Sequence, residues 1–299
     1  MSITANLPKA RHVFPPFPAL TDDHFALQTQ DGTISRSPAI TKRIQFTKTY
    51  VDPPAIALAL AELDISGDQN LRVEAVAKDL TTESFTLWID RYYTTLLYNA
   101  TCNFFEFEPE DPDFQCGRFN LGEHHPWHCP QSETEYKISF RNPYSRPPRV
   151  VLWLAQIDMA YVTAKWSLRC YTTHITPKDF NVHIDARDGS ILYGAAVCWV
   201  AYPADKVGVT SGTFSSNAAR ASDPPHPREF NGHLSFGKPF ESIPNVLFGL
   251  TSFDFGRSYS LRIKTSVTGI TQEGIDWYIG TWADTILHFA EVSYLAIAI

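Results

Sequence analysis

The sequence predicts an all-β protein made of three tandem six-stranded antiparallel β-sandwich domains, and two observations carry this prediction. First, no stretch of helical length has apolar residues at i, i+3, i+4 and i+7. Turn residues instead interrupt short apolar runs about every ten residues, which is typical of antiparallel sandwiches. Second, one set of strand-like segments occurs three times in the 299 residues. Such self-similarity defines the domain organisation.

The clearest repeated segment predicts three consecutive strands. Its copies are Asn70–Phe105, Trp166–Val200 and Tyr259–Ile297. We align them on a shared Leu-Arg pair, which puts three arginines at one position, with separations of 97 and 93 residues: Arg72, Arg169 and Arg262. The same alignment puts Tyr92, Arg187 and Trp282 together one hairpin later. Tight turns are expected between these strands, at Asp79–Glu83, Thr176–Asp179 and Thr271–Gly274.

A second repeated segment, consisting of a strand, a proline-containing turn and another strand, precedes the first. Its copies are Ile44–Asp64, Ile138–Asp158 and Leu234–Asp254. One loop before this segment is short in the first copy and long in the other two. Because loops carry functional variation more often than strands do, this loop is a candidate for a binding element.

The repeats also set the domain boundaries. We predict an N-terminal arm at residues 1–25, rich in proline and polar residues, followed by repeat 1 at 26–108, repeat 2 at 109–205 and repeat 3 at 206–299. A repeat of this length is too long for a solenoid unit and long enough to hold a small core.

Composition excludes several classes of partner. The net charge of −7 and the absence of a basic stripe argue against a nucleic-acid partner. No apolar segment is long enough for a signal peptide or a bilayer span, so we expect no membrane insertion, and a location that is cytoplasmic or reached without a signal peptide. The five cysteines occupy no repeated position and predict no disulfide framework.

Catalysis has no support in the motifs. There is no nucleophile elbow, phosphate loop or dinucleotide fingerprint, so we expect no enzyme and no cofactor. The acidic stretch at residues 106–113 has the carboxylates that glycoside hydrolysis uses, but its prolines favour a linker. The variable loop of repeat 2, from Cys116 to Cys129, holds three histidines and two cysteines. Zinc is one interpretation of this loop, although the spacing fits no standard ligand pattern; polar and aromatic surface contacts are the other.

The aligned arginines and rings suggest sugar binding. An arginine offers a planar fork of donors to neighbouring hydroxyls, and an aromatic ring offers an apolar face to a sugar. The alternative is structural, with each arginine pairing with Asp64, Asp158 or Asp254 at a strand edge.

Several of these segments resemble the H-type lectin domain of snail agglutinins and slime-mould discoidins. The resemblance rests on Pro143–Leu152 and Leu168-Arg169 in repeat 2, and on Ser211–Phe214, Leu261-Arg262 and Thr281–Leu287 in repeat 3. It implies a six-stranded antiparallel sandwich that forms trimers and binds N-acetylgalactosamine (GalNAc) or galactose between subunits. Since this chain supplies three copies, the resemblance implies an intramolecular pseudo-trimer.

The resemblance also implies roles for individual residues. The sugar-binding arginine is Arg72, Arg169 or Arg262, and the aromatic wall is Tyr92 or Trp282. The next position holds Tyr93, Asp188 or Ala283, and Asp223 or Asp284 supplies the acceptor carboxylate in repeat 3. Repeat 2 departs from the pattern, with Arg187 in place of the wall. We therefore expect one good site, in repeat 3.

The sequence thus predicts a non-catalytic lectin for glycans or glycoproteins that end in GalNAc or galactose. Further homo-oligomerisation would restore the multivalency that one site lacks. The alternative is a structural or protein-interaction scaffold whose sugar sites have decayed.

Overall fold

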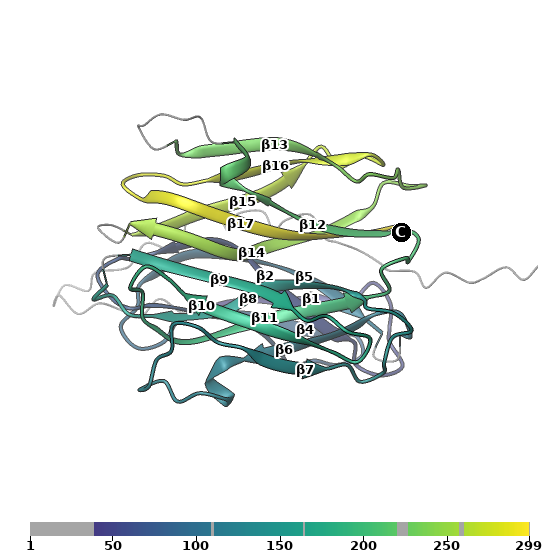
Figure 1. The fold of residues 1–299 in the computed structure, drawn as a ribbon, viewed down its shortest axis with the longest axis horizontal. Helices are drawn as coiled ribbons and strands as arrows, with labels where there is room; N and C mark the ends of the chain where they lie inside the picture. Colours follow the sequence, from purple (N-terminus) through teal and green to yellow (C-terminus); the bar gives the residue numbers. More distant parts are fainter. Residues whose placement is uncertain (1–38, 109–110, 164, 220–226, 257–259, 299) are drawn as a thin grey trace, which may run out of the picture.

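The computed structural model describes residues 39–108, 111–163, 165–219, 227–256 and 260–298 (Figure 1). These residues form β-strands and two short 3-10 turns, η1 (Leu121–Glu123) and η2 (Ser216–Ala219), with no α-helix in the described part. The predicted all-β class is confirmed. No helix in the described ranges is long and apolar enough to cross a membrane.

The strands of each repeat follow one another in the order that the sequence predicts. Those of repeat 1 are β1 (Ile40–Gln45), β2 (Ala55–Ile65), β3 (Leu71–Lys78), β4 (Ser84–Asp90) and β5 (Leu97–Phe107). Those of repeat 2 are β6 (Gln115–Asn120), β7 (Tyr136–Ser139), β8 (Arg149–Met159), β9 (Lys165–Thr173), β10 (Asp179–Ala186) and β11 (Leu192–Tyr202). Those of repeat 3 are β12 (Val209–Ser215), β13 (Glu229–Ser235), β14 (Asn245–Gly256), β15 (Leu261–Thr268), β16 (Gly274–Gly280) and β17 (Ile286–Ile297).

Every sheet joins strands from two repeats. The sheet orders are β1-β4-β3-β8-β11-β6, β12-β17-β14-β9-β10-β7 and β13-β16-β15-β2-β5, and all pairs are antiparallel. We call β3–β8 the first junction, β9–β14 the second and β15–β2 the third. The pairing therefore runs from repeat 1 to repeat 2, from repeat 2 to repeat 3, and from repeat 3 back to repeat 1. In Figure 1 the two strand sets of repeat 3 occupy the upper half of the view, coloured green to yellow.

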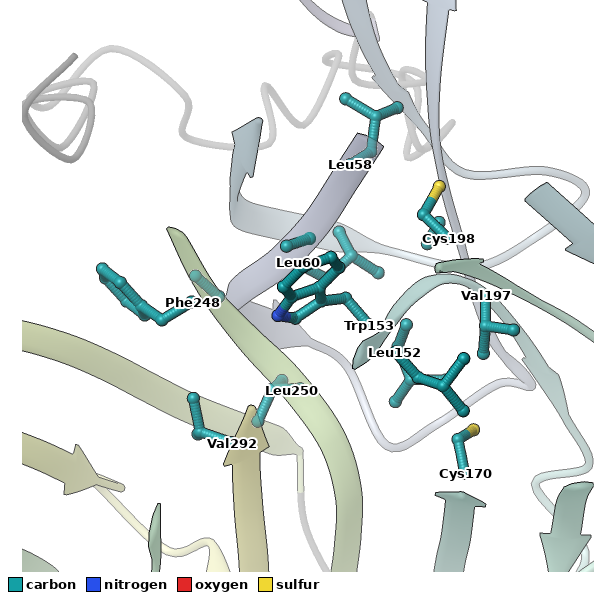
Figure 2. Close-up of a cluster of buried hydrophobic side chains, with 14 of the residues drawn as sticks. Leu58, Leu60, Leu152, Trp153, Cys170, Val197, Cys198, Phe248, Leu250 and Val292 are labelled. Atoms are coloured by element: carbon teal, nitrogen blue, oxygen red, sulfur yellow. The ribbon is translucent and has the colours of Figure 1, made fainter. Parts of the chain in front are cut away.

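The core is deepest where β2, β8 and β14 pack on one another. Trp153 of β8 is fully buried there, among leucines of β2, Phe248 and Leu250 of β14, and Val292 of β17 (Figure 2). Its indole Nε1 donates to the carbonyl of Ser293, 3.1 Å away.

The same strand position holds residues of very different size in the three repeats. The fifth residue after the turn proline is Ala59 in β2, Trp153 in β8 and Gly249 in β14. A Cβ atom added to Gly249 would lie 2.6 Å from the Cβ of Ala59, well inside van der Waals contact. The centre thus accommodates one indole because the other two residues are small.

Candidate functional site

At two junctions, an arginine of one repeat meets an aspartate of the next. Arg72 on β3 lies opposite Asp158 on β8, and its Nε donates to Oδ1 over 3.0 Å. Arg262 on β15 lies opposite Asp64 on β2, with Nε 3.3 Å from Oδ1. All four side chains are mostly buried, at 14–19% exposure. The structural arginine–aspartate pairing therefore exists at Asp64 and Asp158, and it crosses a repeat boundary.

The second junction lacks this pair. Arg169 on β9 lies opposite Ser252, and the residue opposite Asp254 is Ser167. A hydrogen bond from a side-chain hydroxyl to a backbone carbonyl recurs in all three repeats. It joins Thr95 to Asn70, Ser190 to Lys165 and Thr285 to Ser260. The residues two positions after these carbonyls are Arg72, Ser167 and Arg262. Ser167 is thus the counterpart of Arg72 and Arg262. The prediction that Arg169 shares their position is wrong by two residues.

The first junction surrounds its arginine with aromatic rings. The guanidinium of Arg72 lies 4.9 Å from the ring centre of Tyr93 and 5.7 Å from that of Tyr92. Tyr93 is 72% exposed and has a left-handed backbone, with φ of 57°. Burial raises the pKa of Tyr92, and the charge of Asp158 adds to this effect. Among the described residues, only Asp158 accepts a hydrogen bond from Arg72, so its two terminal nitrogens have no acceptor there.

The variable loop of repeat 2 lies beside the first junction. The ring of its Trp127, 68% exposed, lies 6.2 Å from that of Tyr193. Tyr193 sits at a register irregularity of β11, between the residues that pair with Met159 and Asp158. This aromatic pair was not among the predicted site residues, and only the register of β11 against β8 reveals it.

The zinc interpretation of the same loop finds no supporting cluster. No group of three or more His, Cys, Asp or Glu residues that could hold a metal occurs within the described ranges. His124 instead stacks on Phe119 at 5.0 Å, with an angle of 13° between the rings. Cys116 and Cys129 are free thiols.

The third junction has a different acceptor arrangement. Arg262 pairs through Nη1 with Asp284, which is half exposed, in addition to its contact with Asp64. Burial raises the pKa of Asp64, whereas the positive charge of Arg262 lowers it. Trp282 is partly buried at the start of the same turn, where Ala283 has φ of 54°. Arg262, Trp282 and Asp284 therefore come from one repeat, and Asp64 comes from another.

At the second junction a lysine from a different strand position, Lys165, takes over the contact with the aspartate. The ammonium group of Lys165 lies 3.4 Å from Asp188 and 3.8 Å from Asp254. Arg187, at the position of the aromatic wall, is exposed. Sequence comparison missed Lys165, because its counterparts in the other repeats are uncharged.

Asp223, the predicted acceptor for repeat 3, lies outside the described residues. The strand that leads to its loop is described: Ser215, the last residue of β12, pairs with Glu291 in the sheet that contains the second junction. Arg262 lies in another sheet. The predicted grouping of Asp223 with Arg262 and Trp282 remains a prediction.

A cleft of about 490 Å³ lies between repeats 2 and 3, away from the arginines. Its walls are Pro147–Val151, Ile175, Ala204, Ser211–Thr213 and Ser293. Residues 147–151 lie at the start of β8, and Asp158 lies near its other end, roughly 25–30 Å along an extended strand. The cleft and the arginine–aspartate pairs are therefore separate features.

Comparison with known proteins identifies the repeated unit. A model of the H-type lectin domain matches the chain three times, at residues 41–105, 135–202 and 231–297. The chain belongs to the H-type lectin domain family. Each match contains one of the three aspartates that face the neighbouring repeat, and the first and third contain Arg72 and Arg262. The predicted family is confirmed, with all three copies.

One curated relative carries a name that does not mention a lectin. The protein "ATP synthase subunits region ORF 7" of Fuscovulum blasticum is 31% identical over 71 residues, which cover 24% of this chain. The match spans 62% of that relative's length. No solved structure matches the chain. H-type lectin domains are non-enzymatic modules, and membership supports carbohydrate binding as the general function.

Proposed function

We propose that this H-type lectin binds terminal GalNAc or galactose, without catalysis, at the boundaries between its repeats. The observation that carries the proposal is the arginine–aspartate pair at the first junction, where each repeat supplies one partner. We also propose that the three repeats pack as an intramolecular pseudo-trimer. The support for this packing is the strand pairing, which returns from repeat 3 to repeat 1.

The first junction supplies the groups that a neutral sugar requires. Asp158 fixes the guanidinium of Arg72 through Nε and leaves the terminal nitrogens to donate to two neighbouring hydroxyls. Tyr92 and Tyr93 hold the guanidinium by cation–π contact and offer an apolar ring to the sugar. In this proposal the first junction is the principal site, in place of the repeat 3 site that the sequence favoured.

The third junction would bind with another set of groups. Arg262 donates to ring hydroxyls, Asp284 accepts, and Trp282 packs on the apolar face of the sugar. The half-exposed Asp284 supports this role, because only one of its oxygens contacts Arg262 and half of the side chain is open to solvent. Asp223 remains a further candidate acceptor, and Asp188 and Arg169 belong to the second junction.

One observation favours a partly decayed scaffold as the second candidate. At the second junction, Ser167 occupies the position of Arg72 and Arg262 and cannot donate a fork of hydrogen bonds. The arginine is therefore dispensable for the strand pairing itself. If the other junctions had lost binding as well, the chain would be a structural or protein-interaction module.

A glycan array with matched variants tests the proposal. Arg72→Lys keeps the charge that Asp158 needs but removes the planar fork, and should weaken binding to GalNAc- or galactose-terminated glycans roughly tenfold to a hundredfold. Tyr93→Ala should also weaken binding, and the backbone tolerates it because Ala283 adopts the same left-handed conformation in repeat 3.

The control is Arg43→Lys, a change of the same type on β1, where Arg43 contacts Ser84. It should leave the array pattern unchanged. Binding that survives Arg72→Lys but disappears in Trp282→Ala would move the principal site to the third junction. A folded wild-type protein that binds no glycan would support the scaffold.

A further inference from the structure

Two exposed arginines lie near each other beside the second junction. Arg169 on β9 lies opposite Asp185 on β10, and Arg187 follows Asp185 by two residues. Arg187 lies one residue beyond the end of β10, and its backbone N–H donates to the carbonyl of Ser167, which continues the pairing with β9. Side chains alternate along extended backbone, which places Arg187 on the same side as Asp185. Neither guanidinium forms an ion pair or hydrogen bond with a residue that the structure describes.

Tyr171 packs against one member of this pair, Arg169. The guanidinium of Arg169 lies 4.9 Å from the Tyr171 ring centre, and His183 stacks on the ring at 4.5 Å, with only 4° between the planes. The Tyr171 hydroxyl donates to Asp185 over 3.0 Å. Burial and Asp185 raise the pKa of Tyr171, whereas Arg169 and Arg187 both lower it, so both positive charges act at this hydroxyl.

The equivalent positions in the other repeats are neutralised by ion pairs. The counterpart of Arg169 is Glu74 in repeat 1, which binds Arg118 at 2.6 Å, and Lys264 in repeat 3, which lies 3.9 Å from Glu62. At the second junction the residue opposite Arg169 is Ser252, which carries no charge. Arg169 therefore has no ion-pair partner among the residues that the structure describes, unlike its two counterparts.

Of the three acidic groups around this pair, two are engaged in contacts of their own and the third is partly buried. Asp185 is buried and accepts from Tyr171 and from the backbone of Thr134. Asp188 pairs with Lys165. Glu291 is partly buried, and this burial raises its pKa even though Arg169 opposes the shift. None of the three forms an ion pair with either arginine among the described contacts.

The same junction has lost what a neutral sugar would need. Ser167 replaces the arginine of the other junctions, and Arg187 replaces the aromatic wall. We propose that the second junction binds an anionic substituent of a saccharide, a sulfate ester or a carboxylate, held between the guanidinium groups of Arg169 and Arg187. This inference rests on the proposed carbohydrate function, and it gives the three junctions different ligand preferences. Two arginine forks suit either anion, because each presents paired donors to two oxygens.

Calorimetric titration of the full chain tests the inference with three probes: galactose-terminated oligosaccharide, its sulfated form, and a form that carries a carboxylate sugar. The variant is Arg169→Ala with Arg187→Ala, both at exposed positions. It should weaken binding of the anionic probes by at least about tenfold and leave the neutral probe unchanged. Added salt should weaken only the anionic probes.

The control removes the same charge from the same repeat elsewhere, by Arg146→Ala with Arg149→Ala, both exposed. It should change nothing. The two anionic probes distinguish sulfate from carboxylate as the preferred group, and a loss confined to either one supports the inference.

Other outcomes separate the two proposals. Anionic probes that bind equally well to the wild type and the Arg169/Arg187 variant would overturn the inference, and so would binding of the neutral probe alone; the proposed lectin function would stand in both cases. If no probe binds to folded protein, both proposals fail.

Discussion

Trp153→Ala tests whether the three repeats behave as one cooperative body. Trp153 belongs to repeat 2, but its side chain fills the space between β2, β8 and β14, and its indole donates to Ser293 of repeat 3 (Figure 2). Truncation of a fully buried tryptophan costs about 3–5 kcal/mol, because apolar burial is lost and a cavity is left. The lost hydrogen bond falls within that range.

This loss is large relative to the total free energy of unfolding. A folded domain is stable by about 5–15 kcal/mol, so the variant would lose a considerable part of its margin. At roughly 2 °C per kcal/mol for a chain of this length, the melting temperature should fall by about 6–10 °C. Scanning calorimetry and far-ultraviolet circular dichroism should both show one transition, shifted as a whole, since every sheet spans two repeats.

The matched control is Trp127→Ala, which removes the same side chain from an exposed position and should leave the melting temperature within about 1 °C. Two results would refute the reasoning. One is a transition in which about a third of the signal moves while the rest stays, because the repeats would then unfold independently. The other is a shift no larger than that of the control.

Three further predictions concern the centre, the pH dependence and the third junction. Gly249→Ala should destabilise the chain by about 1–3 kcal/mol through its close approach to Ala59 and to the backbone beside it, and Ala59→Gly should recover part of this loss in denaturant titrations. Burial raises the pKa of Glu106 from 4.5 to about 6, so the folded chain binds this proton more tightly than the unfolded chain, and stability falls as the pH rises between these values. Glu106→Gln should therefore stabilise the chain at pH 8 by about 1 kcal/mol, allowing for partial solvent screening, and leave it unchanged at pH 4; a larger gain at pH 4 would contradict the assignment. Asp284→Asn should weaken glycan binding at the third junction without changing the melting temperature, because Asp284 is half exposed and Arg262 keeps its second carboxylate; an unchanged affinity would remove Asp284 from the site.

Local patterns in the sequence were enough to predict the strands and the turns between them. Turn residues and alternation specify a strand and its ends, and the three predicted turns form with one backbone hydrogen bond each, from Thr81 to Ser84, Thr176 to Asp179 and Thr271 to Gly274. The pairing of β3 with β8 is not a local property. An edge strand carries the same free donors and acceptors whether its partner comes from its own repeat or the next, so the sequence did not show that every sheet crosses a boundary.

The error at Arg169 has a specific physical cause. Side chains alternate with a period of two along a strand, so a shift of two residues moves Leu168-Arg169 onto the pattern of Leu71-Arg72 without changing which residues face the core. Hydrophobic patterning cannot detect such a shift. The left-handed residue at the following turn can, because His174 and Asp79 must coincide there. Anchoring the alignment on the turns would have placed Ser167, not Arg169, at the position of Arg72 and Arg262.

The repeats differ in sequence at the centre and at the junctions, and both differences are possible because the repeats are joined in one chain. A trimer of identical chains would place three copies of one residue around its axis, and three indoles could not occupy the space that Trp153 shares with Ala59 and Gly249. Joining the copies in one chain removes this constraint, so each position can change alone. The same freedom applies where two repeats meet. The first junction can keep an arginine between tyrosines while the second exchanges its arginine for Ser167, and neither change forces the other. One chain can therefore present different ligand preferences at sites that a homotrimer would have to keep identical.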